Sequence, residues 1–291
     1  MTTAAASGTV ALSLGAAASW GAGDFTGGVA SRSADPVRVV AGAHICGLVL
    51  AAALASIMRE PLPSPNAAVW GALGGVSGGL ALVALYRALT IGPMGVNAPV
   101  SAVITAALPV FIGLRMQAGV SAPQIAGLAL AALSIVLVSR PERLKGRPRG
   151  LGLAVLAGAG FGIFLVALRQ AGIEHVLWPL AIARAASMLT MLAIIAVASV
   201  RRRRSSSAAE GPRSAAYPWR IVVLAGALDT IGNGLFMFAT QRGSLAVAGA
   251  LSSLYPVTTV LLARAINHER MHRVQALGSF LAIIAVPLIA S

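Results

Sequence analysis

The sequence has few charged residues, which make up 10% of its 291 positions, against about 25% in a typical soluble protein. Hydrophobic residues make up 57%, and the mean hydropathy of +0.85 is spread over the whole length. This spread excludes a soluble enzyme with one membrane anchor, a disordered chain and a coiled coil. The composition therefore predicts an integral membrane protein.

Cysteine and acidic residues are also scarce. The single cysteine, Cys46, excludes an internal disulfide, an iron–sulfur cluster and a thiolate zinc site. Eight acidic residues against 22 basic ones leave a net charge of +14, which would suggest a nucleic-acid partner for a soluble protein. Because nearly all arginines lie between apolar stretches, we interpret them as topology signals instead and expect no nucleic-acid partner. No cofactor is expected either.

Ten apolar stretches are long enough to cross a bilayer, which takes about 20 residues of helix. Their continuous Ala, Leu and Val content predicts helices rather than the alternating strands of a barrel. The expected fold class is an all-α polytopic membrane protein. The predicted spans are 9–30, 37–58, 67–89, 94–115, 122–139, 151–170, 176–199, 220–241, 244–266 and 273–291.

Two hydrophilic segments, 140–150 and 200–218, combine basic residues with Ser, Pro and Gly and are expected to be cytoplasmic loops. Seventeen basic residues flank the odd-numbered loops, whereas four lie on the opposite side. The positive-inside rule places the odd-numbered loops in the cytoplasm, so ten helices place both termini outside. The expected location is the cytoplasmic (inner) membrane, with multiple passes.

The second half of the chain repeats the first at a spacing of 151 residues. This spacing aligns four pairs of Gly or polar residues: Gly92 with Gly243, Ser101 with Ser252, Gln124 with Gln275, and Gly127 with Gly278. Because five helices per half is an odd number, the halves must be inverted, with any substrate site near the midplane between them. The expected repeats are 1–139 and 151–291, joined by the linker 140–150.

Four segments resemble the ten-helix EamA-like branch of the drug/metabolite transporter (DMT) superfamily. They are SWGAGDF at 19–25, YRALTIGPMGVNAPV at 86–100, LDTIGNGLFMFATQRGSLAVAGALSSLYPVTTVLLA at 228–263 and HERMHRVQALG at 268–278. The resemblance covers essentially the whole chain but departs at 115–121, which lacks a counterpart of Glu269. It implies transport of small organic solutes through a central cavity, commonly as export driven by protons or exchange. It does not imply which solute.

Four ionisable residues lie within the predicted spans, where a charge costs about 2.5 to 3.5 kcal/mol. They are Asp24, His44, Arg184 and Asp229. At about 1.5 Å per residue, Asp24 and His44 each lie about 10 Å from the first cytoplasmic loop and could meet. Asp229 lies near the midplane, and Arg184 is the one basic residue deep enough to neutralise an acid across a cavity.

Two possible roles remain open for each of these residues. Asp24 is either a proton carrier or an acid at the cytoplasmic mouth. Asp229, with Asn233 one turn further on, is either the preferred proton carrier or a structural partner of Arg184. Arg184 then holds either a substrate carboxylate or phosphate, or Asp229. His44 is either a proton relay or a residue bonded to a neighbouring hydroxyl or carbonyl.

The uncharged candidates for substrate contact are Trp20, Asn97, Tyr86, Asn233, Gln241 and Tyr255. Trp20 lies one turn before Asp24 and suits either a cavity wall or ordinary packing. Pro256, after Tyr255, and Pro99 and Pro109 predict kinks. Glycines 71, 75 and 79 indicate close helix packing within one subunit rather than a dimer face, and either a monomer or a homodimer is compatible. His268 and His272 are not expected to bind metal.

Three classes of function compete. An enzyme acting on lipid-linked substrates would need clustered catalytic groups at one interface, and the polar residues are instead scattered. A non-transporting assembly or sensor subunit would need no buried Asp or Arg. We therefore expect a secondary active transporter that moves a small organic solute by alternating access. Its expected partners are the solute, the lipid bilayer and protons.

Overall fold

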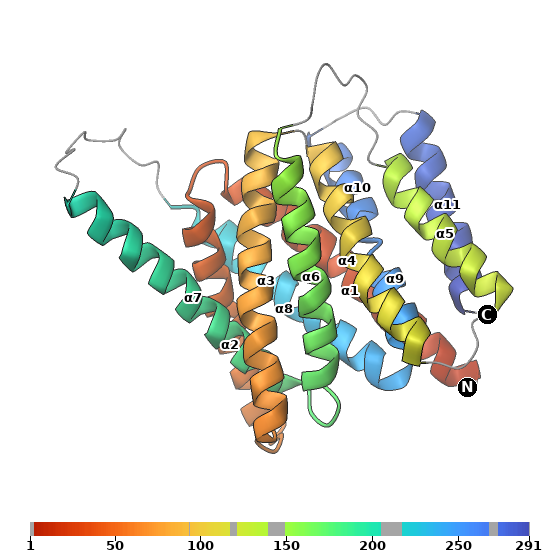
Figure 1. Ribbon diagram of the computed structural model, residues 1–291, viewed down its shortest axis with the longest axis horizontal. Coiled ribbons are helices and arrows are strands. Elements are labelled where there is room, and N and C mark those ends of the chain that lie inside the picture. The colour runs from red at the N-terminus through yellow and green to blue at the C-terminus, as the bar shows by residue number, and fades with distance from the viewer. Residues whose placement is uncertain are drawn as a thin grey trace.

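The computed structural model describes residues 3–92, 94–116, 121–138, 149–204, 217–267 and 273–290, and all the regular secondary structure in them is helical (Figure 1). The helices are α1 (Thr3–Ala30), α2 (Pro36–Ile57), α3 (Pro65–Ile91), α4 (Met94–Met116), α5 (Ala122–Val138), α6 (Leu151–Ala171), α7 (Leu177–Arg204), α8 (Trp219–Arg242), α9 (Leu245–Ser252), α10 (Tyr255–Asn267) and α11 (Arg273–Ala290). Each predicted span coincides with a helix except the ninth, which is split in two. The predicted all-α fold class is confirmed.

The ninth span is broken into α9 and α10 by the two residues Ser253 and Leu254. Pro256 is the second residue of α10, a position that proline tolerates because the amide it lacks has no partner within the helix. In the first repeat, α4 continues as one helix through Pro99 and Pro109. The sequence therefore located the irregular region, but the break falls just before Tyr255.

Local sequence signals set several helix ends. Asp35 caps α2, where its side chain accepts hydrogen bonds from the amides of Val37 (3.0 Å) and Arg38 (3.4 Å), and Pro36 follows as the first helical residue. Ser244 caps α9 in the same way, accepting from Val247 N at 3.1 Å. These caps satisfy amides that have no partner within the helix.

The helices pack in pairs that are repeated between the halves. Helix α1 of the first repeat packs against α8 of the second. Its counterpart α6, in the second repeat, packs against α3 of the first. The pair α3–α7 likewise corresponds to α8–α2, whereas α2–α7 and α5–α11 each join equivalent helices across the molecule. Such an arrangement is expected when two similar five-helix units are related by an approximate two-fold axis.

Two matching close contacts give the alignment of the repeats. A Cβ on Gly75 of α3 would collide with the carbonyl of Ala183 on α7, and a Cβ on Gly226 of α8 would collide with the carbonyl of Ala43 on α2. The two glycines are 151 residues apart and the two alanines 140 residues apart. The spacing changes within the segment from α7 to α8, because Ala183 and Gly226 are eleven residues further apart in the chain than Ala43 and Gly75.

The repeat also governs how α3 and α8 end. Both end before a glycine with extended backbone, Gly92 (φ −145°) and Gly243 (φ −149°). The amide of each glycine donates to the carbonyl four residues earlier, Ala88 or Ala239, and both distances are 3.0 Å. Gly92 and Gly243 are one of the pairs aligned in the sequence. The spacing of 151 therefore corresponds to equivalent structure.

The glycine-rich faces of α3 are covered by helices of the same chain. Gly75 and Gly79 abut Ala183 and Ser187 of α7, whereas Gly78 abuts Phe164 of α6. Without side chains at these positions the helix backbones approach closely enough for continuous van der Waals contact. The expected packing within one subunit is therefore observed at these positions.

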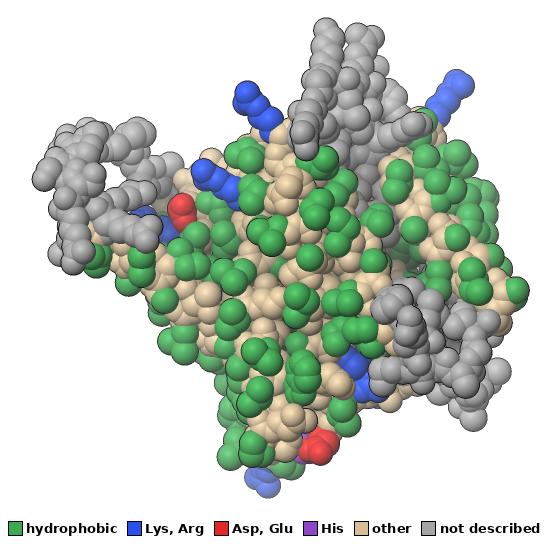
Figure 2. Space-filling model, viewed as in Figure 1, with side chains coloured by type: hydrophobic (Ala, Val, Ile, Leu, Met, Phe, Trp, Pro, Cys, Tyr) green, Lys and Arg blue, Asp and Glu red, His purple; other side chains and the backbone are tan. Residues whose placement is uncertain are grey.

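The outward faces of the helices are apolar. Large hydrophobic side chains such as Val49 (64% exposed), Leu156 (61%) and Leu189 (61%) point away from the core. Figure 2 shows hydrophobic side chains over the middle of the molecule and charged side chains toward two opposite ends. Among the described residues, α2, α3, α6, residues 177–200 of α7, and α8 are long and apolar enough to span a bilayer, and shorter apolar helical segments lie at 100–109, 122–134 and 245–259. This surface suits a lipid environment.

Several features singled out in the sequence fall outside the described residues. They are the greater part of the linker 140–150, residues 205–216 of the second basic loop, residues 117–120, the segment containing His268, Glu269 and His272, and Ser291.

Candidate functional site

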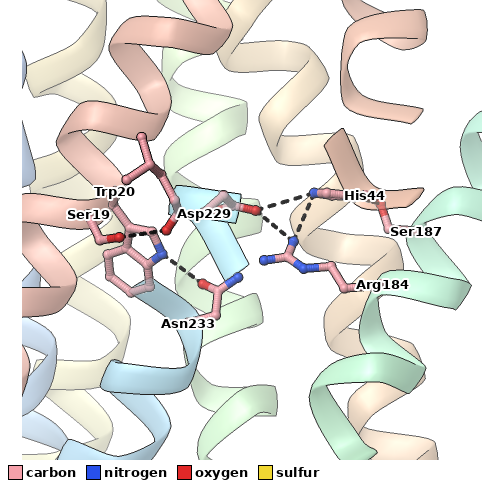
Figure 3. A network of polar contacts seen from close by, with 8 residues as sticks. Ser19, Trp20, His44, Arg184, Ser187, Asp229 and Asn233 are labelled. Carbon is pink, nitrogen blue, oxygen red and sulfur yellow. Dashed lines mark hydrogen bonds and ion pairs between the residues drawn. The ribbon is translucent and has the colours of Figure 1, made fainter. Parts of the chain in front are cut away.

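Asp229 of α8 and Arg184 of α7 form a buried ion pair in which Arg184 Nη1 lies 2.7 Å from Asp229 Oδ2 (Figure 3). The Arg184 side chain is 4% exposed and that of Asp229 is 21% exposed. The pair joins two helices of the second repeat that follow one another in the chain. The sequence left two roles open for Arg184, and the geometry shows that one terminal nitrogen is engaged by Asp229.

His44 of α2 extends this pair. Arg184 Nη1 also lies 2.9 Å from His44 Nε2, and the other ring nitrogen, Nδ1, lies 2.6 Å from the hydroxyl of Ser187. A guanidinium can only donate, so Nε2 is the acceptor and Nδ1 carries the proton that is donated to Ser187. This pattern describes a neutral imidazole bonded to a hydroxyl and to Arg184. His44 Nε2 lies 3.5 Å from Asp229 Oδ2, at the edge of the same cluster.

A second polar contact joins α1 to α8. The indole nitrogen of Trp20 donates to Asn233 Oδ1 at 2.8 Å, and the hydroxyl of Ser19 donates to the carbonyl of Leu228 at 2.7 Å. Because an indole N–H can only donate, this contact fixes which end of the Asn233 amide is oxygen. The Trp20 ring also packs against Phe236, with ring centroids 5.7 Å apart.

A cavity with about 380 Å³ of empty space lies between the two repeats. Its walls come from three helices of the first repeat and their three counterparts in the second, α6, α8 and α10. The lining residues are Trp20, Asp24, Leu82, Thr105, Phe161, Phe164, Leu165, Asp229, Asn233 and Tyr255. Its mainly apolar lining with a few polar groups is typical of a small-molecule site.

A second cavity, with about 270 Å³ of empty space, borders the first on the side of α2 and α7. It is lined by His44, Arg184 and Ser187 together with the α3 glycines Gly75, Gly78 and Gly79. The two cavities share four lining residues, namely Leu82, Phe161, Phe164 and Asp229. Asp229 therefore separates the His44–Arg184 cluster from the larger cavity.

Asp24 differs from Asp229 in having no ion pair or hydrogen bond with any described residue. It lines the larger cavity with Trp20, as their spacing of one helical turn predicts. It does not share a cavity with His44, so the expected meeting of these two residues is not observed. The closest acid along the cavity wall is Asp229.

The remaining sequence candidates have different surroundings. Tyr255 lines the larger cavity and its buried hydroxyl has no hydrogen-bond partner among the described residues. Asn97 lines neither cavity; its amide donates to the carbonyls of Ala88 (2.8 Å) and Arg149 (3.0 Å). Tyr86 is packed against Gly27 of α1, and Gln241 donates to the carbonyl of Gly172 at 2.6 Å. These three residues support the helix ends and helix contacts around the site.

Sequence reasoning missed Phe161, Phe164, Thr105 and Ser187, all of which line a cavity. The two phenylalanines stand three residues apart on α6 and so face the same side, a signal that the sequence did contain. The spacing of the repeats relates Phe164 to Asp24 and Gly78 to Asp229. The contact between α1 and α8 carries two acids, whereas the equivalent contact between α6 and α3 carries an aromatic ring against a glycine.

Comparison with known proteins agrees with this architecture. A crystal structure described only as "Crystal structure of protein" superposes with a TM-score of 0.72 at 18% sequence identity, covering 97% of this chain and 96% of the other. This similarity shows the fold. No curated protein matches the chain. The sequence matches the EamA-like transporter family twice, over residues 7–140 and 148–291. The chain therefore belongs to the EamA-like transporter family and is a multi-pass membrane transporter of small solutes.

Proposed function

We propose that the protein is a secondary active transporter that exports a small organic solute across the cytoplasmic membrane in exchange for protons. Asp24 is the group that takes up and releases the proton. The observation that carries the proposal is that Asp24 lines the cavity between the repeats and has no ion-pair or hydrogen-bond partner among the described residues. A carboxylate in this position can change its charge in response to protons or to a solute.

Asp229 is less suited to this role than the sequence suggested. Its 2.7 Å contact with Arg184 stabilises the ionised carboxylate, and protonation would leave the buried guanidinium without its counter-ion. The proposal therefore places the proton on Asp24 and gives Asp229 the task of holding Arg184 beside the cavity.

Exchange requires that the proton and the solute cannot bind at the same time. A solute with an ammonium group fulfils this condition, because it can replace the proton as the neutralising partner of Asp24. Trp20, Phe161 and Phe164 share the cavity with Asp24 and supply aromatic faces that attract such a cation. An inward proton gradient would then drive the solute outward.

Alternating access is supported by the source of the cavity walls. Residues from α1, α3 and α4 face residues from their counterparts α6, α8 and α10, so a rocking of one repeat against the other would open the cavity alternately at its two ends. The break between α9 and α10, at Ser253 and Leu254, lies directly before Tyr255 of the cavity wall and is a point where the backbone can adjust.

The test uses the full chain in liposomes that contain a pH-sensitive dye. Leucinamide, uridine, glucose 6-phosphate and tetraphenylphosphonium are added in turn, and solute-dependent proton movement is recorded. We expect movement with at least one cationic probe and its loss in Asp24→Asn. The matched control is Glu174→Gln, which removes an exposed acid between α6 and α7. Undiminished solute-dependent proton movement by Asp24→Asn would exclude the proposed role.

A further inference from the structure

Three buried nitrogen atoms beside the ion pair have no hydrogen-bond partner among the described residues. They are Nε and Nη2 of Arg184 and Nδ2 of Asn233. Arg184 is 3% exposed and Asn233 is fully buried. All three are donors, so none of them can satisfy another. Two buried oxygens close to Arg184 also have no hydrogen-bond partner among the described residues: Asp229 Oδ2, which is in the ion pair, and Thr230 Oγ1, which lies with Arg184 Nε against Gly47 of α2. Buried donors are nearly always paired in folded proteins, which makes a cluster of three unpaired donors an indication of a ligand.

The orientation of these donors is fixed by the contacts already described. Nη1 of Arg184 forms the ion pair with Asp229 and the hydrogen bond with His44. This leaves Nε and Nη2, the two nitrogens along one edge of the guanidinium. The indole of Trp20 donates a hydrogen bond to Oδ1 of Asn233, so Nδ2 of Asn233 points away from the indole. Figure 3 shows the Arg184 and Asn233 side chains pointing toward one another next to Asp229. Unpaired donors from α7 and α8 therefore lie on either side of Asp229, which lines both cavities.

We infer that the free edge of Arg184 and the Nδ2 of Asn233 bind the carboxylate of the transported solute. The planar edge offers two parallel N–H groups, which match the two oxygens of a carboxylate. Asn233 adds a third donor from the opposite side. The inference deepens the proposed function, because it assigns the acidic group of the solute to one wall of the cavity that Asp24 lines.

Charge favours a carboxylate over a doubly charged phosphate. The positive charge of Arg184 is already shared with Asp229, so a second single negative charge is the most that the cluster can accommodate without strong repulsion. The adjoining walls formed by Phe161, Phe164 and Leu82 are apolar and suit the hydrocarbon part of a small acid.

Access to the donors requires a small movement. Each of the three nitrogens is closed off from solvent in this conformation, and the larger cavity reaches Asn233 but not Arg184. Because the two residues stand on different helices, a shift of α8 relative to α7 would open the space between them. Binding of the carboxylate is thereby linked to the relative position of these helices.

The experiment measures ligand-induced changes in the melting temperature, and the Kd by calorimetry, of the purified full chain. The probes are 4-methylpentanoate, its uncharged amide 4-methylpentanamide, and leucine, which adds an ammonium group to the same carbon skeleton. We expect the carboxylate to stabilise the protein and the amide to have no effect. Equal effects of the acid and its amide would overturn the inference.

Two variants test the donors separately. Arg184→Lys keeps a positive charge for Asp229 but removes the bidentate edge, so we expect at least about a tenfold loss of affinity for 4-methylpentanoate. Asn233→Asp keeps the acceptor for Trp20 and adds a carboxylate next to Arg184. It should raise the melting temperature of the ligand-free protein and abolish binding of the acid.

Gln170→Glu on α6 is the matched control, because it makes the same amide-to-acid change at a residue that lines neither cavity. It should bind 4-methylpentanoate as the unaltered protein does. Retained binding of 4-methylpentanoate by both Arg184→Lys and Asn233→Asp would refute the site. If Arg184→Lys does not fold, binding by Asn233→Asp alone is the test.

The leucine arm identifies the source of the carboxylate and separates this inference from the proposed function. Tighter binding of leucine than of 4-methylpentanoate, with the advantage lost in Asp24→Asn, identifies a zwitterion. Equal binding identifies a simple acid, which supports the carboxylate site and contradicts the role of Asp24 as an ammonium partner. Proton exchange with leucinamide but no binding of either acid would leave the proposed function standing and remove the carboxylate site.

Discussion

His44 and Arg184 occupy equivalent positions in the two repeats, 140 residues apart, and contact each other with Arg184 Nη1 2.9 Å from His44 Nε2. They follow Ala43 and Ala183, whose carbonyls make the matching contacts with Gly226 and Gly75. The approximate two-fold axis therefore passes close to the polar cluster. A strong donor on one side and an acceptor on the other make the contact favourable, whereas identical charges at these positions would repel.

Removing the ion pair should destabilise the protein unless both partners are removed. Arg184→Met leaves a buried unpaired carboxylate, so we expect a loss of about 3 to 5 kcal/mol in the free energy of unfolding. Asp229→Asn in the same chain should restore much of this loss. Unfolding of the two single variants and the double variant in detergent measures the coupling. Strictly additive effects would contradict the ion pair.

Glu60, between α2 and α3, is predicted to stabilise the start of α7. Its carboxylate accepts hydrogen bonds from the amides of Val176 (2.9 Å), Leu177 (3.1 Å) and Trp178 (2.8 Å). Glu60→Gln replaces one acceptor oxygen by a donor, so we expect a loss of about 1 to 2 kcal/mol. Thermal unfolding provides the measurement. The exposed change Glu174→Gln should have little effect, and an equal loss there would contradict the capping role.

The matched glycines Gly75 and Gly226 should tolerate alanine poorly. A Cβ at either position collides with a backbone carbonyl, which cannot move as a flexible side chain can, so we expect a loss of about 1 to 3 kcal/mol. Gly152→Ala is the control, since a Cβ there meets nothing within 4 Å. Alanine at that position should be neutral or stabilising. Unfolding transitions of the three variants compare these effects, and equal stability would disprove the close helix approach.

Both chain ends are predicted to face the outside, on the distribution of seventeen basic residues against four. Fusions after Ser291 to one reporter that is active only outside the cytoplasm and another that is active only inside measure this orientation. A C-terminal fusion that is active only in the cytoplasm would reverse the topology and with it the proposed direction of the helices.

The sequence was sufficient to determine the helical fold class, the ten apolar segments and the repeat. These properties depend on local composition, since about 20 consecutive apolar residues must form a helix when they cross a bilayer. The repeat was visible because glycine and polar residues recur at one spacing, and the equivalent caps at Gly92 and Gly243 show why. The family resemblance came from the same segments.

The arrangement of the polar residues was decided by the tertiary structure. Depth along a helix is a function of sequence position, so the sequence identified Asp24, His44, Arg184 and Asp229 as buried, but the rotation of each helix depends on its neighbours. Because α1 packs on α8, Asp24 faces the larger cavity rather than His44. Because α7 packs beside α2, Arg184 contacts both His44 and Asp229. Which buried acid is neutralised and which guanidinium edge is left unpaired follow from contacts between residues more than 40 positions apart, which no local pattern in the chain encodes.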